Sequence, residues 1–235
     1  MIACLAFDFD GTLVDSNHVK LRAFYEIVEE YDPSGTTVTE VLQQCPNEDR
    51  YGITRELVRT FRAKGRLPMQ PNLEALSAQW AEAYTETCQK SIVTCTEVPG
   101  ASVILEWLSD QGIPAYVNSR TPTDVLNRLV ALRGLTHYFS GIFGAPASKL
   151  ENLRRIQGLA RAKPDEILFV GDSEDDRKAA LEMGCHFVGV NLGEESRFTH
   201  PLPELQIADL YHLQSIMITL QAKDTQIVNN NSGFF

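Results

Sequence analysis

Two aspartates stand one residue apart near the start of the chain. Asp8 and Asp10 follow residues 2–6, an apolar run typical of a buried strand. Side chains at i and i+2 of an extended segment point the same way, and two carboxylates so close raise each other's pKa unless a cation lies between them. Mg²⁺ takes oxygen ligands and shares its coordination shell with water and phosphate. The pair therefore predicts a magnesium site, beside a turn at Gly11 and Thr12 whose backbone N–H groups can face an anion.

A second acidic cluster, at residues 172–176, follows another apolar run at 167–170. Ligands of open α/β sheets bind beyond the carboxyl ends of the strands, so Asp172 can converge with Asp8 and Asp10 although it is distant in sequence. Acidic residues also occur in a first helical turn simply because they complement the helix dipole. Taken alone, the second cluster fits either a ligand site or an ordinary helix start.

Helix and strand signals alternate from residue 99 onward, which predicts a parallel sheet with crossover helices. Proline and glycine separate the elements, and Thr121-Pro122 predicts a helix with a threonine cap and proline at its first position. The expected strands are 2–6, 113–117, 141–143, 167–170, 187–190 and 205–208, and the expected helices are 101–111, 122–134, 149–162 and 173–184.

Residues 15–94 show helix after helix and no convincing strand, with the best helices expected at 17–31, 52–63 and 72–90. This pattern predicts a helical subdomain inserted into the sheet-containing part. The expected fold class is α/β, with a Rossmann-like parallel-sheet core over 1–14 and 95–222 and a helical insertion over 15–94. Residues 223–235 are polar and rich in asparagine, which predicts a frayed tail.

The amino-acid composition argues against a nucleic-acid-binding protein, a disulfide-rich or zinc-binding protein and a membrane protein. The 235 residues carry a net charge of −10, and 43% of them are hydrophobic, which favours a folded core and disfavours a nucleic-acid surface. Five cysteines without a C-x-x-C pair indicate neither a disulfide framework nor a zinc site. No apolar run approaches the ~18 residues of a membrane span, and no signal peptide is apparent. We therefore expect a cytoplasmic protein without a membrane or nucleic-acid partner.

The segments 8–16 and 171–176, with a lysine between them, resemble the motifs of the haloacid dehalogenase superfamily of phosphotransferases. The resemblance implies that Asp8 is the nucleophile and Asp10 the general acid/base. It also implies a Mg²⁺ site formed by Asp8, Asp10 and Asp172. The helical insertion is similar to the cap of the family's small-molecule phosphatases.

The same resemblance implies supporting roles for further residues. Ser173 and Asp176 correspond to neighbours of the metal ligands. The family's lysine corresponds best to Lys149, at the start of the helix expected over 149–162. Lys163 is the competing position, but it lies very close to the strand at 167–170.

The expected phosphate site departs from the family pattern at one position. The second strand of the family usually ends in Ser or Thr, whereas Asn118 precedes Ser119 here. Either the Asn118 amide or the Ser119 hydroxyl could hold the phosphate. The other residues implied for phosphate binding are Gly11, Thr12 and Lys149.

The resemblance implies a Mg²⁺-dependent phosphatase that forms an aspartyl-phosphate and acts on a small phosphorylated metabolite, such as phosphoglycolate or a sugar phosphate. An acid at Asp10 suits a phosphate ester, whose leaving oxygen needs a proton, whereas a halide needs none. A sugar phosphomutase is the first alternative, because His18 lies near Lys20, where mutases have a histidine. A non-catalytic phospholigand-binding protein is the second, suggested by Asn118. Monomer and homodimer both remain open.

Arginines recur through residues 50–66 at the i, i+4, i+7 and i+11 spacing of one helical stripe. The simpler interpretation is a solvated face. The alternative is that part of the stripe faces the active site and attracts an anionic substrate. The candidate specificity residues of the insertion are His18, Lys20, Arg50, Tyr51 and Arg55.

Overall fold

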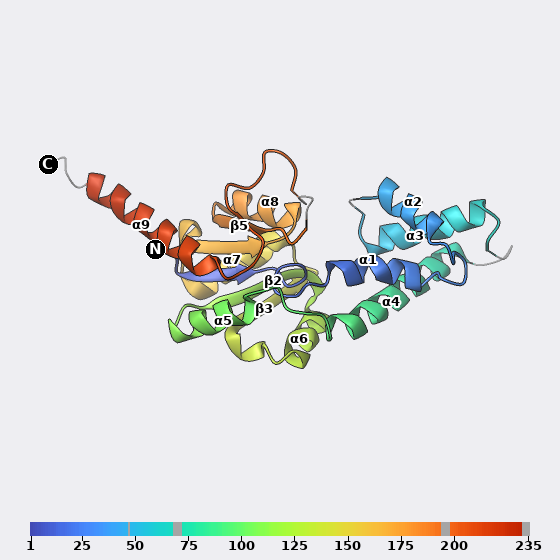
Figure 1. Cartoon of the computed structure of the whole chain (residues 1–235), viewed down its shortest axis with the longest axis horizontal. Coiled ribbons are helices and arrows are strands. Elements are labelled where there is room, and N and C mark those ends of the chain that lie inside the picture. The colour runs from blue at the N-terminus through green and yellow to red at the C-terminus, as the bar shows by residue number, and fades with distance from the viewer. Residues whose placement is uncertain (47, 68–71, 194–197, 232–235) are drawn as a thin grey trace. The chain divides into compact units, whose positions relative to one another are not determined.

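The computed structural model describes residues 1–46, 48–67, 72–193 and 198–231, with side chains described as far as residue 222. The chain divides into two compact units, one formed by Met1–Asp15 with Cys95–Phe235 and the other by Ser16–Thr94. The first unit contains a parallel sheet with helices on both sides, and the second consists of helices and their connections (Figure 1).

The sheet confirms the predicted α/β class. Its strand order is β3-β2-β1-β4-β5-β6, and every neighbouring pair is parallel. Strands buried on both faces should be continuously apolar, and β1 and β4 are buried throughout. The strands are β1 (Cys4–Phe7), β2 (Ala115–Pro122), β3 (Phe139–Ala145), β4 (Ile167–Gly171), β5 (His186–Val190) and β6 (Gln206–Ile207).

The crossover helices cover both faces of this sheet. Figure 1 shows α5 and α6 on one side of the strands and α8 on the other. Helices α7 and α8 pack against each other. Two short 3₁₀ turns, η1 (Thr136–Tyr138) and η2 (Pro164–Glu166), precede β3 and β4. The helices of this unit are α5 (Ala101–Asp110), α6 (Thr123–Leu132), α7 (Lys149–Ala160), α8 (Glu174–Met183) and α9 (Leu213–Asn231).

The alternation of side chains along the strands decides which polar residues face α7. Ala6 of β1 and Tyr116 of β2 belong to the same buried cluster as Leu153 of α7. Since strand side chains repeat with period two, Asp8 and Asn118 continue the face that Ala6 and Tyr116 occupy. This register directs both polar groups toward α7.

The structure corrects the predicted start of the helix after β2. Strand β2 continues to Pro122, and α6 begins at Thr123 with Pro122 as its N-cap and no side-chain cap. The expected threonine cap at Thr121 is therefore wrong. Pairing with β3 resumes after a register shift, at Pro122 and Ala145, and this pairing outweighs the local preference of the Thr-Pro pair for a helix start.

The structure also places residues 223–231 in α9, where the sequence predicted a frayed tail. Extending an existing helix fixes one residue for each new hydrogen bond, so a helix nucleated at Leu213 can continue through a polar segment. Residues 232–235 of that predicted tail lie outside the described residues. Among the helices that the structure describes, none combines the length and apolarity needed to cross a membrane.

The second unit contains four described helices: α1 (Asn17–Glu26), α2 (Thr36–Gln44), α3 (Arg50–Ala63) and α4 (Leu73–Ile92). They bury an aromatic cluster in which Trp80 lies 5.8 Å from Phe61 and 5.5 Å from Tyr31, measured between ring centroids. Helix α1 ends earlier than predicted, and α2 was not predicted. The α2 segment is rich in threonine, a residue with low helix propensity, so its sequence alone does not indicate a helix.

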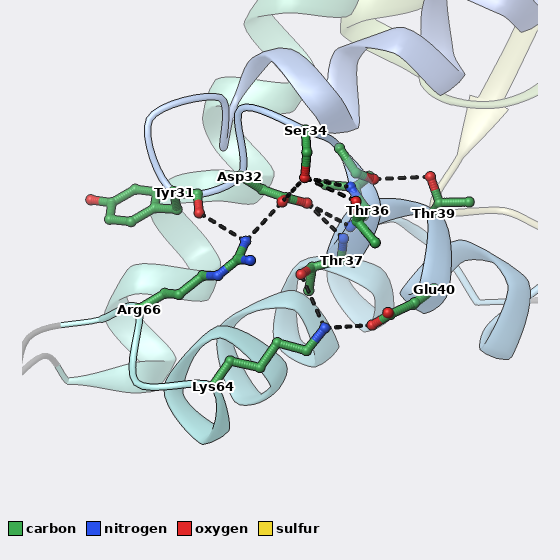
Figure 2. Close-up of polar contacts among 11 residues, drawn as sticks. Tyr31, Asp32, Ser34, Thr36, Thr37, Thr39, Glu40, Lys64 and Arg66 are labelled. Carbon is green, nitrogen blue, oxygen red and sulfur yellow. Dashed lines mark hydrogen bonds and ion pairs between the residues drawn. The ribbon is translucent and has the colours of Figure 1, made fainter.

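A buried aspartate explains how α2 begins (Figure 2). Asp32 Oδ2 accepts hydrogen bonds from the backbone N–H groups of Thr37 (2.7 Å) and Val38 (3.1 Å) in the first turn of α2. Its Oδ1 pairs with Arg66 Nη1 at 2.8 Å, and the same nitrogen donates to the Tyr31 carbonyl at 3.2 Å. Burial would raise the pKa of Asp32, but the hydrogen bonds from Val38, Arg66 and Thr37 hold that pKa below its usual value.

The arginine stripe is shorter than the spacing predicted. Helix α3 ends at Ala63, so Arg66 lies beyond it and pairs with Asp32. Arg55, Arg59 and Arg62 are exposed on α3, with Arg59 Nη1 3.5 Å from Glu56. Exposure of the remaining three arginines agrees with a solvated face, and recruitment of an anion by Arg55 stays a prediction.

We expect Asp32→Asn to lower the free energy of unfolding of this unit by about 1–2 kcal/mol at pH 7, because the charge-assisted bonds to Arg66 and the helix N–H groups weaken. A depressed pKa gives stability above the unfolded pKa of about 3.9, and that stability is lost as pH falls through the folded pKa. The difference between the two proteins should therefore shrink below about pH 4.

Urea denaturation across pH 7 to 3 measures this difference. Trp80 fluorescence in a Trp107→Phe background reports on this unit, because Trp107 belongs to the other one. A variant as stable as the parent at pH 7 would contradict the expectation, as would a difference that does not change with pH.

Candidate active site

A buried lysine lies at the centre of the polar groups at the carboxyl edge of the sheet. Lys149 is 4% exposed, and its Nζ lies 2.8 Å from Asp8 Oδ1, 2.7 Å from Asp176 Oδ1 and 2.8 Å from the Asn118 carbonyl oxygen. These three acceptors match the three N–H donors of an ammonium group. Burial would lower the pKa of Lys149, but Asp176 and Asp8 outweigh it and raise that pKa, so the lysine stays protonated.

Local sequence places Lys149 at this point. Ser148 forms a capping box with Glu151, which makes Lys149 the first residue of α7. Asn118 Nδ2 donates to the Lys149 carbonyl oxygen at 2.9 Å, and Asn118 Oδ1 accepts from Asn152 Nδ2 at 3.1 Å. Asn118 is fully buried, so its amide joins β2 to the first turn of α7.

Asp8 directly follows β1, where its N–H donates to the Val170 carbonyl of β4 at 2.8 Å. Its side chain is buried, and Oδ1 accepts from the Phe9 N–H at 2.7 Å in addition to the contact with Lys149. Burial raises the pKa of Asp8 to about 6; Asp176 and Asp10 add to the rise, and Lys149 opposes it. One ammonium therefore does not fully offset the cost of the negative charge at Asp8.

Two further carboxylates come from the segment after β4: Asp172 directly follows the strand, and Asp176 is in the first turn of α8. Oxygen atoms of Asp8, Asp172 and Asp176 all lie within 4.8 Å of one another. Ser173 caps α8 and bonds to Asp176 reciprocally, with the Ser173 N–H 3.1 Å from Asp176 Oδ2. A Cβ at Gly171 would fall 2.5 Å from the Asp176 Cβ, so only glycine lets Asp176 approach the end of β4 so closely.

This donor set suits a hard divalent cation. Three carboxylates face one ammonium, and carboxylate oxygens are the ligands that Mg²⁺ prefers. Sequence reasoning placed Asp10 in the metal set, whereas the described residues that form this carboxylate cluster include Asp176 in its place. The Asp10 carboxylate accepts a hydrogen bond from Thr121 Oγ1, 3.1 Å from its Oδ2.

The other predicted phosphate ligands lie on the turn after β1 and at the end of β2. The Gly11 N–H donates to the Val14 carbonyl at 2.7 Å and so closes its own turn. Thr12 is fully buried, and its hydroxyl has no partner among the described residues. Ser119 is also buried, and its Oγ accepts from the Thr121 N–H at 3.2 Å.

Asn152 and Thr121 belong to this network but were not predicted as site residues from the sequence. Asn152 lies three positions after Lys149, and residues three apart share a helix face, so this position could have been identified. Asn118 lies two residues after Tyr116, so the two side chains point to the same face of β2, toward α7. This follows only once β2 is known to extend past Val117. The contact of Thr121 with Asp10 spans 111 positions and has no local signal.

The candidate specificity residues lie in the other unit. His18 and Lys20 are on α1, where His18 is exposed and Lys20 half-buried. At the start of α3, Arg50 Nη2 donates to the Tyr51 hydroxyl at 3.1 Å, and its guanidinium carbon lies 4.6 Å from the centre of the Tyr51 ring. Arg55 is exposed one turn further along α3.

Comparison with known proteins identifies the family of this chain. A family model for haloacid dehalogenase-like hydrolases matches residues 5–190. The chain belongs to that family. It is 27% identical over 206 residues to a phosphoglycolate phosphatase of Pectobacterium atrosepticum, covering 84% of this chain and 85% of that protein.

Solved structures of other proteins share the fold of this haloacid dehalogenase-like hydrolase. A protein of Haemophilus somnus, described as a predicted phosphoglycolate phosphatase, has a TM-score of 0.71 at 20% identity and covers 92% of this chain and 98% of its own. Magnesium-bound YfnB of Bacillus subtilis has a TM-score of 0.65 at 17% identity, with 92% and 98% covered. The predicted family, and with it a hydrolase of the phosphoric monoester type, is confirmed.

We expect Asn118→Ala to lower the free energy of unfolding by about 3 kcal/mol. The substitution leaves the Lys149 carbonyl and the Asn152 amide buried without their partner, at about 1–3 kcal/mol for each group. Ser119→Ala removes the acceptor of one N–H bond, so it should cost about 1 kcal/mol. Urea denaturation of both variants measures the two effects, and equal losses would argue against a structural role for Asn118.

Proposed function

We propose that this protein is a Mg²⁺-dependent phosphatase that hydrolyses a small phosphorylated metabolite through an aspartyl-phosphate at Asp8. The observation that carries the proposal is the convergence of Asp8 with Lys149, Asp172 and Asp176 at one edge of the sheet. Phosphoglycolate phosphatases among its relatives support the reaction class.

Asp8 is the proposed nucleophile. Its Oδ1 is engaged by Lys149 and the Phe9 N–H, which leaves Oδ2 to attack phosphorus. The new bond joins Asp8 Oδ2 to phosphorus as the bond from phosphorus to the leaving oxygen breaks. The Lys149 ammonium offsets the repulsion between this carboxylate and the phosphoryl oxygens.

Asp10 is the proposed general acid/base. In the first step it gives its proton to the leaving oxygen, which departs as an alcohol. In the second step it takes a proton from the water that attacks the aspartyl-phosphate, and this restores both Asp8 and the protonated Asp10. Burial of Asp10 at 4% exposure keeps this proton exchange away from bulk solvent.

The Ser119 hydroxyl is the better candidate of the two for phosphate. The Asn118 amide is committed to Lys149 and Asn152 within the core, whereas Ser119 Oγ only accepts from the Thr121 N–H and keeps its own proton to donate. The departure from the family pattern at Asn118 is therefore compatible with catalysis.

Asp8 and Asp172 are the proposed ligands of Mg²⁺, with Asp176 beside them and joined to Lys149. When bound, Mg²⁺ supplies a Lewis acid that withdraws charge from the phosphoryl group. Burial, with smaller contributions from Asp176 and Asp10, raises the pKa of Asp8, which fits a site that has more carboxylates than cations of its own. Binding of magnesium by the similar structure YfnB supports this choice of metal.

Phosphoglycolate or a sugar phosphate is the proposed substrate. We expect release of inorganic phosphate from at least one member of a panel of such metabolites, dependent on Mg²⁺ and abolished by chelator. Asp8→Asn should reduce release at least 10³-fold, because the variant lacks the nucleophile. Asp110→Asn, which changes an exposed aspartate on α5, is the matched control.

The products of this assay also separate the alternatives. Isomerised substrate without net phosphate release would indicate a phosphomutase and direct attention to His18. Absence of both products, with saturable binding of a phosphorylated ligand, would indicate a binding protein. Turnover that survives Asp8→Asn would reject the proposed nucleophile.

We expect Mg²⁺ to raise the melting temperature of the wild type and to raise that of Asp172→Asn much less. Ligand at 100 times its Kd stabilises a protein by about 2.7 kcal/mol, and loss of one carboxylate ligand weakens binding. Asp175→Asn removes the same charge three residues later, in the first turn of α8, at a half-exposed position paired with Arg120, so it should keep the wild-type shift. Equal shifts in all three proteins would argue against metal binding at Asp172.

A further inference from the structure

The end of β2 departs from regular pairing beside the candidate active site. Asn118 pairs with Phe143 and Pro122 with Ala145, so β2 uses four residue steps where β3 uses two. Residues 119–121 of β2 thus lie opposite the single residue 144 of β3 and form an irregularity with two extra residues. Such bulges occur next to active sites, where they redirect side chains that a regular strand would point elsewhere.

Thr121 lies within this irregularity and makes two contacts with the proposed catalytic groups. Its Oγ1 lies 3.1 Å from Asp10 Oδ2, and its N–H donates to Ser119 Oγ at 3.2 Å. The hydroxyl is not used as a helix cap, because α6 begins at Thr123 without a side-chain cap. One residue thus connects the proposed acid with the proposed phosphate ligand.

The neighbouring strand holds Thr121 in place. A Cβ at Gly144 of β3 would fall 2.2 Å from the Thr121 carbonyl oxygen, so the absence of a side chain at Gly144 lets that carbonyl pack closely. Thr123 Oγ1 accepts from the Gly144 N–H and donates to the Ala145 carbonyl, each at 3.1 Å. These contacts fix the backbone of the irregularity on both sides of Pro122.

We propose that Thr121 is a positioning residue for Asp10, an inference that rests on the proposed phosphatase function. The Thr121 hydroxyl donates to Asp10 Oδ2, so the transferable proton is carried by Oδ1. This fixes the rotation of the carboxyl group. As Asp8 Oδ2 bonds to phosphorus and the bond from phosphorus to the leaving oxygen breaks, the proton of Asp10 Oδ1 passes to that oxygen. Misorientation of Asp10 slows this proton transfer, and it also slows the later transfer from water, which kcat/KM does not include.

The test compares leaving groups that differ in their need for a proton. Thr121→Val keeps the branched shape and removes the hydroxyl, and Thr121→Ser keeps the hydroxyl. The substrates are p-nitrophenyl phosphate, whose phenolate leaves without protonation, and an alkyl phosphate, either 2-phosphoglycolate or glucose 6-phosphate, whichever the wild type turns over faster. We measure kcat/KM, which includes loss of the leaving group and excludes hydrolysis of the aspartyl-phosphate.

We expect Thr121→Val to lower kcat/KM for the alkyl phosphate roughly 10- to 100-fold, part of the 10²–10⁴-fold supplied by a general acid. The value for p-nitrophenyl phosphate should change less than about threefold, and Thr121→Ser should restore the alkyl phosphate to within about threefold of wild type. A merely structural role would reduce both substrates together.

Two kinds of failure are distinguishable. Equal losses on both substrates, or no loss on either, would overturn the role of Thr121 while the wild type still released phosphate in an Asp8-dependent way. Absence of wild-type turnover, or turnover independent of Asp8, would overturn the proposed function itself.

Discussion

The ammonium group of Lys149 is the charge on which the arrangement of this site depends. A charge in a protein interior must be paired and fully hydrogen-bonded, because the desolvation of an uncompensated ion costs several kcal/mol. Lys149 meets this condition with oxygens of Asp8, Asp176 and Asn118. These partners come from the position after β1, from within β2 and from the first turn of α8. A single cation therefore fixes the separation of three elements, and it orients the proposed nucleophile as it does so.

The sheet order makes this pairing possible. Strand β1 lies between β2 and β4, so the residues that follow these three parallel strands meet at one edge. Asp8 is flanked on one side by Asn118 and on the other by Asp172. The crossover that precedes β4 places the N-terminus of α7, and hence Lys149, over the same edge. At this edge three carboxylates lie near one ammonium group, so the protein's own charges sum to a negative value. A divalent metal bound there would offset that negative charge and allow a phosphate to bind.

The sequence predicted the parts of this site that depend on short motifs and strand ends. Asp8 and Asp172 each lie directly after a strand, and hydrophobic runs followed by acidic residues and glycine or serine mark such strand ends well. Lys149 was predicted only through the resemblance to the family. The orientation of Asn118 was not predicted, because the strand was expected to end at Val117. The alternation of side chains between the two faces of a strand says nothing about residues beyond its end.

Other differences arise where tertiary contacts outweigh local preference. Thr121 precedes proline, as a helix cap would, yet the pairing of Pro122 with Ala145 continues the strand past it, and its hydroxyl bonds to Asp10. The sequence of helix α2 has a weak intrinsic helix propensity. The start of this helix depends on Asp32, which lies outside the helix and accepts hydrogen bonds from two N–H groups of its first turn. Neither contact could be inferred from periodicity, since each joins segments whose proximity only the fold establishes.

The position of the helical insertion explains why motifs identify the reaction more readily than the substrate. The chain leaves the first unit after Asp15 and re-enters it at Cys95, and these two points are neighbours: the Asp15 N–H donates to the Thr96 carbonyl at 3.0 Å, and Val14 pairs with Glu97 in an antiparallel bridge. The turn that carries the first two aspartates is thus closed within its own unit. All the proposed catalytic groups belong to that unit, so the insertion can change its surface side chains without altering the acids, the lysine or their spacing. Reaction type is therefore constrained by the core, whereas substrate choice depends on residues that no motif fixes.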